Sequence, residues 1–243
     1  MDNMHAKLCA IGVLALAVWS GLARAEAPAA EKGETLLAPA DAEKVLAELA
    51  ARFKAAPALK ARIVTEMEDL VGTRKEEGEL LLDRPGRMLR KFSKPSARVQ
   101  ALIDDRFVEY LPALKKLAVK DFSRAPHALQ LVQAAFTVDA KALSEMFSLA
   151  VFEKTTPEGH AYRLVLTKKP EVKRALYSSI QARIAPKEIF FHEIEYYPEG
   201  GEKIVERYLD IQPVAKPIAA DFAIDVPADV ARQTDIVNDE SLK

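Results

Sequence analysis

The chain has 243 residues, a length that suits one large domain or two small ones. Hydrophobic residues make up 49% and charged residues 29%, which is typical of a globular protein. Its formal net charge is −1, so no global field would draw it to nucleic acid or to an anionic membrane. Lysine and arginine form short pairs rather than a basic stripe. We therefore expect no nucleic-acid partner.

The first 25 residues have the pattern of a secretory signal peptide. Lys7 precedes an apolar run from Leu8 to Leu22, and Ala23 and Ala25 are small residues at the positions that a signal peptidase reads. The run is shorter than the ~20 apolar residues that a membrane span needs. We expect cleavage after Ala25 and export to the periplasm. Cys9 is the only cysteine, so the mature chain would have no disulfide and no thiolate metal site.

Residues 26–40 are rich in Ala, Pro and Glu and predict a disordered leader. No linker interrupts residues 41–237, which we expect to form a single domain, followed by a tail over residues 238–243. Asp41 is a candidate N-cap for a helix over Ala42–Lys54. The apolar residues of this helix, spaced for one face, are Val45, Leu46, Leu49 and Phe53.

After Pro57 the apolar period shortens to two, which indicates strands. Residues 72–78 look like a polar connection, and two further helices are expected over His127–Phe136 and over Ala140–Leu149, with Asp139 as a cap. The predicted strands are Ala61–Glu68, Glu79–Arg84, Met88–Phe92, Arg98–Ile103, Phe107–Leu111, Leu114–Val119, Ala161–Thr167, Tyr177–Ile184, Glu188–Tyr197, Lys203–Ile211 and Asp221–Val226.

Together these elements predict a mostly β (α+β) fold, a strongly curved antiparallel half-barrel sheet covered by helices. The inner face of such a sheet is either filled by side chains or left as a cavity beneath the helices.

The sequence shows no constellation typical of catalysis. It has no Gly-rich phosphate loop and no Gly-x-Ser-x-Gly elbow. The histidines His127, His160 and His192 have no neighbour at metal-ligand spacing. The carboxylate pairs at 76–77 and 104–105 fall in predicted turns, where solvated charge is the default. We expect no enzyme activity, no metal and no cofactor.

After the helix that includes Val45, four segments follow in order: ELLLDRPGRM, KFSKP, VQALIDDRFVEYLP, and DFAIDVPADV near the end of the chain. Taken together, they resemble the LolA family, whose members carry lipoproteins through the periplasm to the outer membrane. The resemblance covers nearly the whole mature chain. It implies a half-barrel that works as a monomer without ATP and binds lipoprotein or other acylated lipid as cargo. It also implies an inner-membrane release complex and an outer-membrane acceptor as partners.

The resemblance also implies a gate. Arg84, followed by Pro85, corresponds to the family arginine that ties the sheet to lid helices in the closed state. Carbonyls near Phe136 or Leu149 would accept its hydrogen bonds, and cargo entry would displace them. The residues expected to line the cavity are Ile63, Met67, Leu82, Met88, Phe92, Phe107, Tyr110 and Met146.

Three alternatives stay open. The first is a regulator of LolA-like fold that senses lipoproteins and binds an anti-sigma factor. The second is a carrier of another lipid or glycolipid. The third is a hydrolase, which the lack of a nucleophile and base pair disfavours.

Overall fold

The computed structural model describes residues 29–69, 72–84, 86–126, 129, 133, 138–172, 177–199 and 202–238. The expected signal peptide, Pro85, most of the helix expected over His127–Phe136 and residues 239–243 lie outside the described residues.

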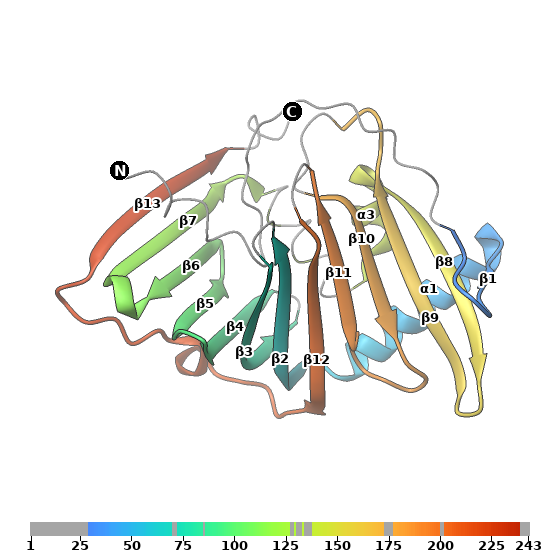
Figure 1. Ribbon diagram of the computed structural model, residues 1–243, viewed down its shortest axis with the longest axis horizontal. Helices are drawn as coiled ribbons and strands as arrows, with labels where there is room; N and C mark the ends of the chain where they lie inside the picture. Colours follow the sequence, from blue (N-terminus) through green and yellow to red (C-terminus); the bar gives the residue numbers. More distant parts are fainter. Residues whose placement is uncertain are drawn as a thin grey trace.

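One curved thirteen-stranded sheet dominates the described chain (Figure 1). Its strands, in spatial order, are β1 (Thr35–Leu36), β8 (Phe147–Thr156), β9 (Gly159–Lys168), β10 (Tyr177–Ile184), β11 (Glu193–Pro198), β12 (Ile204–Pro213), β2 (Ala58–Asp69), β3 (Gly72–Asp83), β4 (Arg87–Lys94), β5 (Arg98–Ile103), β6 (Arg106–Leu111), β7 (Lys116–Arg124) and β13 (Ala231–Asn238).

The sheet consists of two meanders joined at one strand pair. Strands β2 to β7 form one meander and β8 to β12 the other, and β12 pairs antiparallel with β2, placing Ile63 opposite Tyr208. All neighbouring strands are antiparallel except β13, which runs parallel to β7. The two halves of the chain thus share one continuous sheet.

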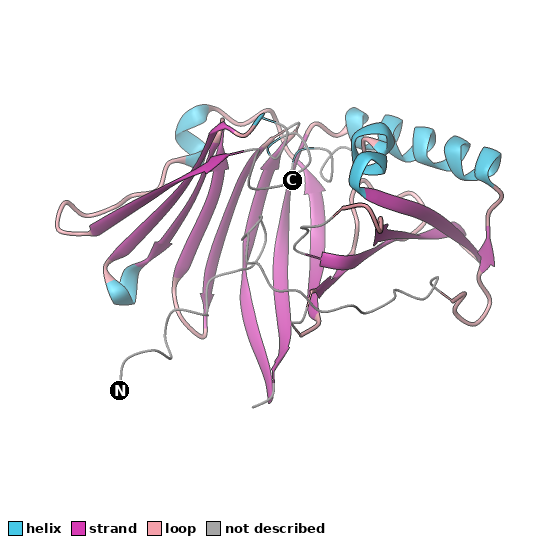
Figure 2. Cartoon of the chain, turned by 90° about the horizontal axis from the view of Figure 1, so that it is seen from above, coloured by secondary structure: helices cyan, strands magenta, loops and turns pink. Residues whose placement is uncertain are grey.

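Helices α1 (Pro39–Ala55) and α3 (Ala140–Met146) lie on the same side of the sheet (Figure 2). We call the face that they cover the inner face. The four apolar residues predicted for one face of α1 are all buried there, in a single cluster with side chains of β2, β3, β4, β8, β9, β10 and β12. The predicted Asp139 cap is confirmed, because its carboxylate accepts the Ala142 N–H at 3.1 Å. Asp41 is not the cap of α1: the helix begins earlier, at Pro39, and Asp41 lies in its first turn.

The opposite, outer face is partly covered by the chain between β12 and β13, which includes a short 3₁₀ helix η2 (Ala219–Phe222). A second 3₁₀ helix, η1 (Pro112–Leu114), joins β6 to β7. Phe222 is fully buried against Leu89 and Ala101, and Val230 packs against Leu117. Apolar side chains on the outer face of β4 to β7 are therefore shielded by the returning chain.

The segment over residues 72–78 is not a connection but the first half of β3, which pairs residue by residue with β2. The strand was not predicted because its residues are mostly charged. The glutamate at position 76 is nevertheless buried, where it pairs with an arginine of β5. The leader also differs from its prediction, since residues 35–36 form β1 against β8 and α1 begins at Pro39.

Two further strands of the structure, β8 and β13, were not among the predicted strands. The helix expected over Ala140–Leu149 ends at Met146, and the chain continues directly as β8. The last strand is β13, not Asp221–Val226, which holds the end of η2 and a segment without strand structure. Strand β7 is not an edge strand, because β13 pairs with its outer side.

Candidate functional site

Arg84 follows β3 and joins three parts of the fold. Its Nη1 donates to the carbonyl oxygens of Phe53 and Ala56 at 2.7 and 2.5 Å, and its Nη2 donates to that of Ile189 at 3.1 Å. The guanidinium carbon lies 4.5 Å from the ring centroid of Phe53 and 5.4 Å from that of Phe190. The side chain thus ties the sheet to the end of α1 and to the loop between β10 and β11.

The end of a helix explains why an arginine suits this position. The last carbonyls of α1 have no partner within the helix, and their partial negative charge favours a cation. Burial lowers the pKa of Arg84 to about 10, so the guanidinium stays charged at neutral pH. The acceptors that the structure gives for Arg84 lie at the end of α1 and at Ile189, whereas Leu149 lies in β8. Phe136 lies outside the described residues, so the expectation of an acceptor near it stays a prediction.

A hollow of about 630 Å³ lies beside Arg84, between α1 and the start of α3. Its volume falls within the range of small-molecule sites. Its walls are mainly apolar, with charged groups at a few points. The lining residues are Glu43, Leu46, Ala47, Ala50, Phe53, Lys54, Pro57, Arg84, Val138, Asp139 and Ala140.

Most of the residues expected to line a cavity are packed in the core instead. Ile63, Leu82, Met88, Phe92 and Phe107 are all buried in the inner-face cluster, and none lines the hollow. Side chains therefore fill this part of the inner face.

The other three candidates are dispersed. Met67 and Met146 are half-buried and lie outside that cluster. Tyr110 lies on the outer face, where it packs against Leu117 and Val230, and its assignment to the cavity is corrected. Phe107 and Tyr110 are three residues apart on one strand, so the two-residue period places their side chains on opposite faces.

Next to the apolar core, the inner face carries a buried polar band that the sequence analysis missed. Arg90 is 1% exposed, and its two terminal nitrogens donate to the carboxylate of Glu206 at 2.7 and 3.0 Å. The hydroxyl of Tyr208 also donates to Glu206. Burial lowers the pKa of Arg90, but the negative charge of Glu206 more than offsets this, so the net pKa is raised.

The band continues across β3, β5 and β6. Arg98 pairs with Glu76 and lies 3.4 Å from Glu109, which also accepts a hydrogen bond from Gln100 at 2.8 Å. On each strand these polar residues lie two or four residues from a buried apolar residue, as Arg90 lies two from Met88, and they therefore point to the same inner face. This two-residue spacing is the sequence signal that could have located them.

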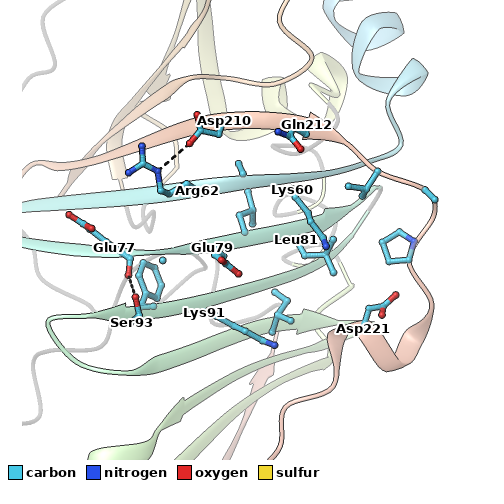
Figure 3. Close-up of a pocket in the computed structure, with 18 of the residues that line it drawn as sticks. Lys60, Arg62, Glu77, Glu79, Leu81, Lys91, Ser93, Asp210, Gln212 and Asp221 are labelled. Atoms are coloured by element: carbon cyan, nitrogen blue, oxygen red, sulfur yellow. Dashed lines mark hydrogen bonds and ion pairs between the residues drawn. The ribbon is translucent and has the colours of Figure 1, made fainter.

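The outer face has a groove of about 1040 Å³ between β2, β3, β4 and the returning chain (Figure 3). Arg62 and Asp210 form an ion pair at 3.3 Å there, and Lys94 pairs with Glu77 at 3.2 Å. Although this groove is larger than the hollow, charged side chains of both signs line it. Apolar cargo would gain little free energy in such surroundings.

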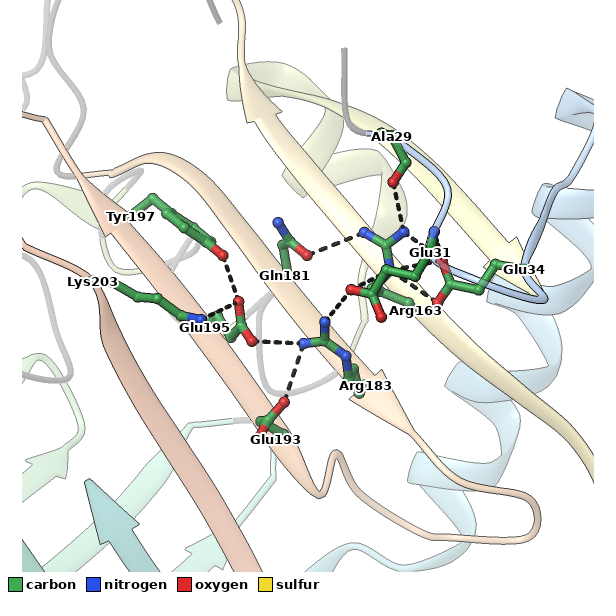
Figure 4. A network of polar contacts seen from close by, with 10 residues as sticks. All are labelled: Ala29, Glu31, Glu34, Arg163, Gln181, Arg183, Glu193, Glu195, Tyr197 and Lys203. Atoms are coloured by element: carbon green, nitrogen blue, oxygen red, sulfur yellow. Dashed lines mark hydrogen bonds and ion pairs between the residues drawn. The ribbon is translucent and has the colours of Figure 1, made fainter. Parts of the chain in front are cut away.

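A network of ion pairs also crosses the outer face farther along the sheet (Figure 4). Arg163 holds Glu34 at 2.5 Å, and Arg183 pairs with Glu31 and, at 3.1 Å, with Glu193. These contacts hold the residues just before β1 against β9 and β10.

Among the described residues, no three His, Cys, Asp or Glu side chains are grouped in a way that could hold a metal ion. No helix within the described ranges is both long and apolar enough to cross a bilayer.

This chain is similar to known proteins in structure rather than in sequence. No family model matches the sequence. No curated protein matches it either. An uncharacterized conserved protein from Thermus thermophilus is similar in structure with a TM-score of 0.50 and 11% identity, over 80% of this chain and 99% of that one.

The curved open sheet with helices on its inner face agrees with the order of motifs in the sequence. The predicted half-barrel, which is the fold that the resemblance to the LolA family implies, is confirmed. Weaker structural overlap is found with a LolA superfamily protein from Nitrosomonas europaea, at 9% identity and a TM-score of 0.40, over 75% of this chain and 97% of that one. A chain of the Pseudomonas aeruginosa MucA/MucB complex overlaps with 14% identity and a TM-score of 0.45, over 79% of this chain and 63% of that one.

Proposed function

We propose that this LolA-like protein is a carrier that binds the acyl part of a lipoprotein, or of another acylated lipid, and moves it between membranes through the periplasm. The observation that carries the proposal is the apolar hollow between α1 and the start of α3, with Arg84 in its wall. The N-terminal apolar run and the small residues before position 26 support export.

The energetics of an acyl chain explain what such a hollow would do. Each buried methylene contributes about 0.8 kcal/mol, so a long chain does not cross water unaccompanied. A carrier has to offer apolar surface that can open again for release. Ala47 and Ala50 present such surface along one flank of α1, above the buried Leu46 and Phe53.

Arg84 supplies a reversible closure. Its hydrogen bonds hold the last turn of α1 through backbone carbonyls, and these bonds can be exchanged without breaking a covalent bond or burying a new charge. Cargo that lifts the end of α1 would trade these bonds for apolar contacts. Cargo can then shift the equilibrium between the closed and open states by as much as its affinities for the two states differ.

The proposal assigns no chemical reaction to the chain and therefore no catalytic residue or cofactor. It implies a membrane component that loads the carrier and another that accepts its cargo. The proposal also takes the protein to be a monomer, as the resemblance to the LolA family implies.

The test is native mass spectrometry of the protein purified from the periplasm, followed by transfer of labelled cargo to acceptor vesicles. We expect a bound mass that an organic solvent extracts as an acylated molecule. A protein that carries no lipid and takes up no acylated ligand in vitro would refute the carrier function.

A further inference from the structure

We infer that the hollow beside Arg84 takes one acyl chain with an anionic end group, as in a fatty acid or a lysophospholipid, rather than several chains at once. This inference rests on the proposed function and narrows its cargo. Two observations carry it: the volume of the hollow and the distribution of charge along it.

The volume admits one chain. Liquid water takes about 30 Å³ per molecule, and a methylene, with one heavy atom, takes a similar volume, so a chain of 16 carbons needs ~500 Å³ and three such chains ~1500 Å³. The hollow holds about 630 Å³. Within the described part of the neighbouring inner face the hollow has no extension toward Leu82 and Met88, because both side chains are fully buried. A triacylated cargo would therefore leave most of its apolar surface in water.

The charges along the hollow differ between its ends. Lys54 lies in the last turn of α1, where Arg84 also binds, whereas Glu43 lies near the beginning of the helix. Eleven residues separate Glu43 from Lys54, which is about 16 Å along a helix axis. The lining also includes Asp139, the cap of α3, whose carboxylate accepts the Ala142 N–H at 3.1 Å. Along α1 the hollow is thus basic at the end of the helix and acidic near its beginning.

The basic end is the favourable place for an anion despite the helix dipole. The end of α1 carries about half a negative charge, whereas Lys54 and Arg84 contribute two full positive charges beside it. Lys54 is exposed and forms no ion pair with any residue that the structure describes. A carboxylate or phosphate at this end would find a cation available, with the acyl chain lying along Ala50 and Leu46.

The first experiment blocks the hollow. Ala50 lines it and is half-buried, so Ala50→Phe would fill part of the volume needed by the chain. The matched control is Ala51→Phe, an exposed position on the same helix that does not line the hollow and has the same cost in helix propensity. Calorimetric titration with palmitate should show one chain per protein, an affinity at least tenfold lower for Ala50→Phe, and no change for the control.

The second experiment removes the cation. Lys54→Gln should weaken palmitate binding about two- to fivefold, the effect of one exposed ion pair, and leave hexadecanol binding unchanged. Lys44→Gln is the control, because Lys44 is an exposed lysine of α1 outside the hollow. Thermal melts followed by circular dichroism verify that all variants fold. Equal affinity of the wild type for palmitate and hexadecanol would overturn the anionic end group.

A tripalmitoylated lipopeptide separates this inference from the function on which it rests. Weaker binding of the lipopeptide than of palmitate supports a single-chain site. Tighter binding of the lipopeptide, unaffected by Ala50→Phe, would overturn the inference and leave the carrier function standing. Failure of palmitate, lysophospholipid and lipopeptide alike to bind would refute the carrier function itself.

Discussion

Replacing Arg84 by Met should release the end of α1 from the sheet. Three hydrogen bonds from a charged group contribute ~1.5–3 kcal/mol each, about 4–9 kcal/mol together. Against this stands the cost of burying the guanidinium: burial lowers its pKa to about 10, and a shift of this size corresponds to ~3 kcal/mol. The net loss in unfolding free energy is therefore about 1–6 kcal/mol, with ~3 kcal/mol as the central expectation.

The assay combines urea unfolding with amide hydrogen exchange. We expect a lower midpoint and, below it, faster exchange in the last two turns of α1 and around Ile189, because these segments lose their common anchor. Arg62→Met is the control, since Arg62 is an exposed arginine whose ion pair with Asp210 contributes at most ~1 kcal/mol. Unchanged stability and unchanged exchange in Arg84→Met would refute the anchoring role.

Three further predictions concern the sheet. Arg90→Met should cost ~3–5 kcal/mol of unfolding free energy, because it leaves the carboxylate of Glu206 buried without its cation, and adding Glu206→Gln should restore much of the loss in a double-mutant cycle. Gly78→Ala should lower the melting temperature by several degrees, because a Cβ there would lie 2.4 Å from the carbonyl oxygen of Lys91. Burial raises the pKa of Glu34, but hydrogen bonds and nearby arginine charges lower it by more, so the net pKa is lowered. The ionised Glu34 should therefore stabilise the folded protein above about pH 4.5, and this contribution should be lost as pH falls below that value. Unfolding free energies measured between pH 3 and 7 test this.

Each of these has a clear contrary outcome. Additive effects of the two changes at Arg90 and Glu206 would show that they do not act as a pair. A Gly78→Ala protein as stable as the wild type would mean that the backbone of β4 can shift freely. Glu34→Gln should flatten part of the acid dependence, and an identical pH profile would remove Glu34 as its source.

Local alternation was sufficient to locate much of the sheet. Strands Arg98–Ile103 and Tyr177–Ile184 have the predicted ends, because apolar residues alternate and turn residues bound them. The strand over residues 72–78 was not predicted, because its buried glutamate gives no apolar alternation. That glutamate pairs with Arg98, 22 residues farther along the chain, and no local pattern shows this pairing. Strand β13 was missed because its side chains are mostly exposed, so it has no apolar face to show.

The site was harder to predict than the fold. Arg84 was selected through its family resemblance, but its acceptors come from α1, and no local pattern connects position 84 with positions 53 and 56. The lining of the hollow was missed because Ala47 and Ala50 are small helix residues without any chemical signature. A cavity is defined by what neighbouring elements leave empty, and this depends on packing between residues distant in sequence.

The ion pairs on the outer face bear on which part of the molecule can move. From Glu34 through Arg163 on β9, and from Arg183 through Glu193 to Arg207 on β12, charged side chains link neighbouring strands from the edge toward the centre. Ion pairs between strands oppose any change in the angle between those strands. The sheet then keeps a fixed curvature, and the adjustment to cargo of different lengths falls to α1, which is held at its end by the hydrogen bonds of Arg84 and by the packing of Phe53 against Phe190 and Phe191.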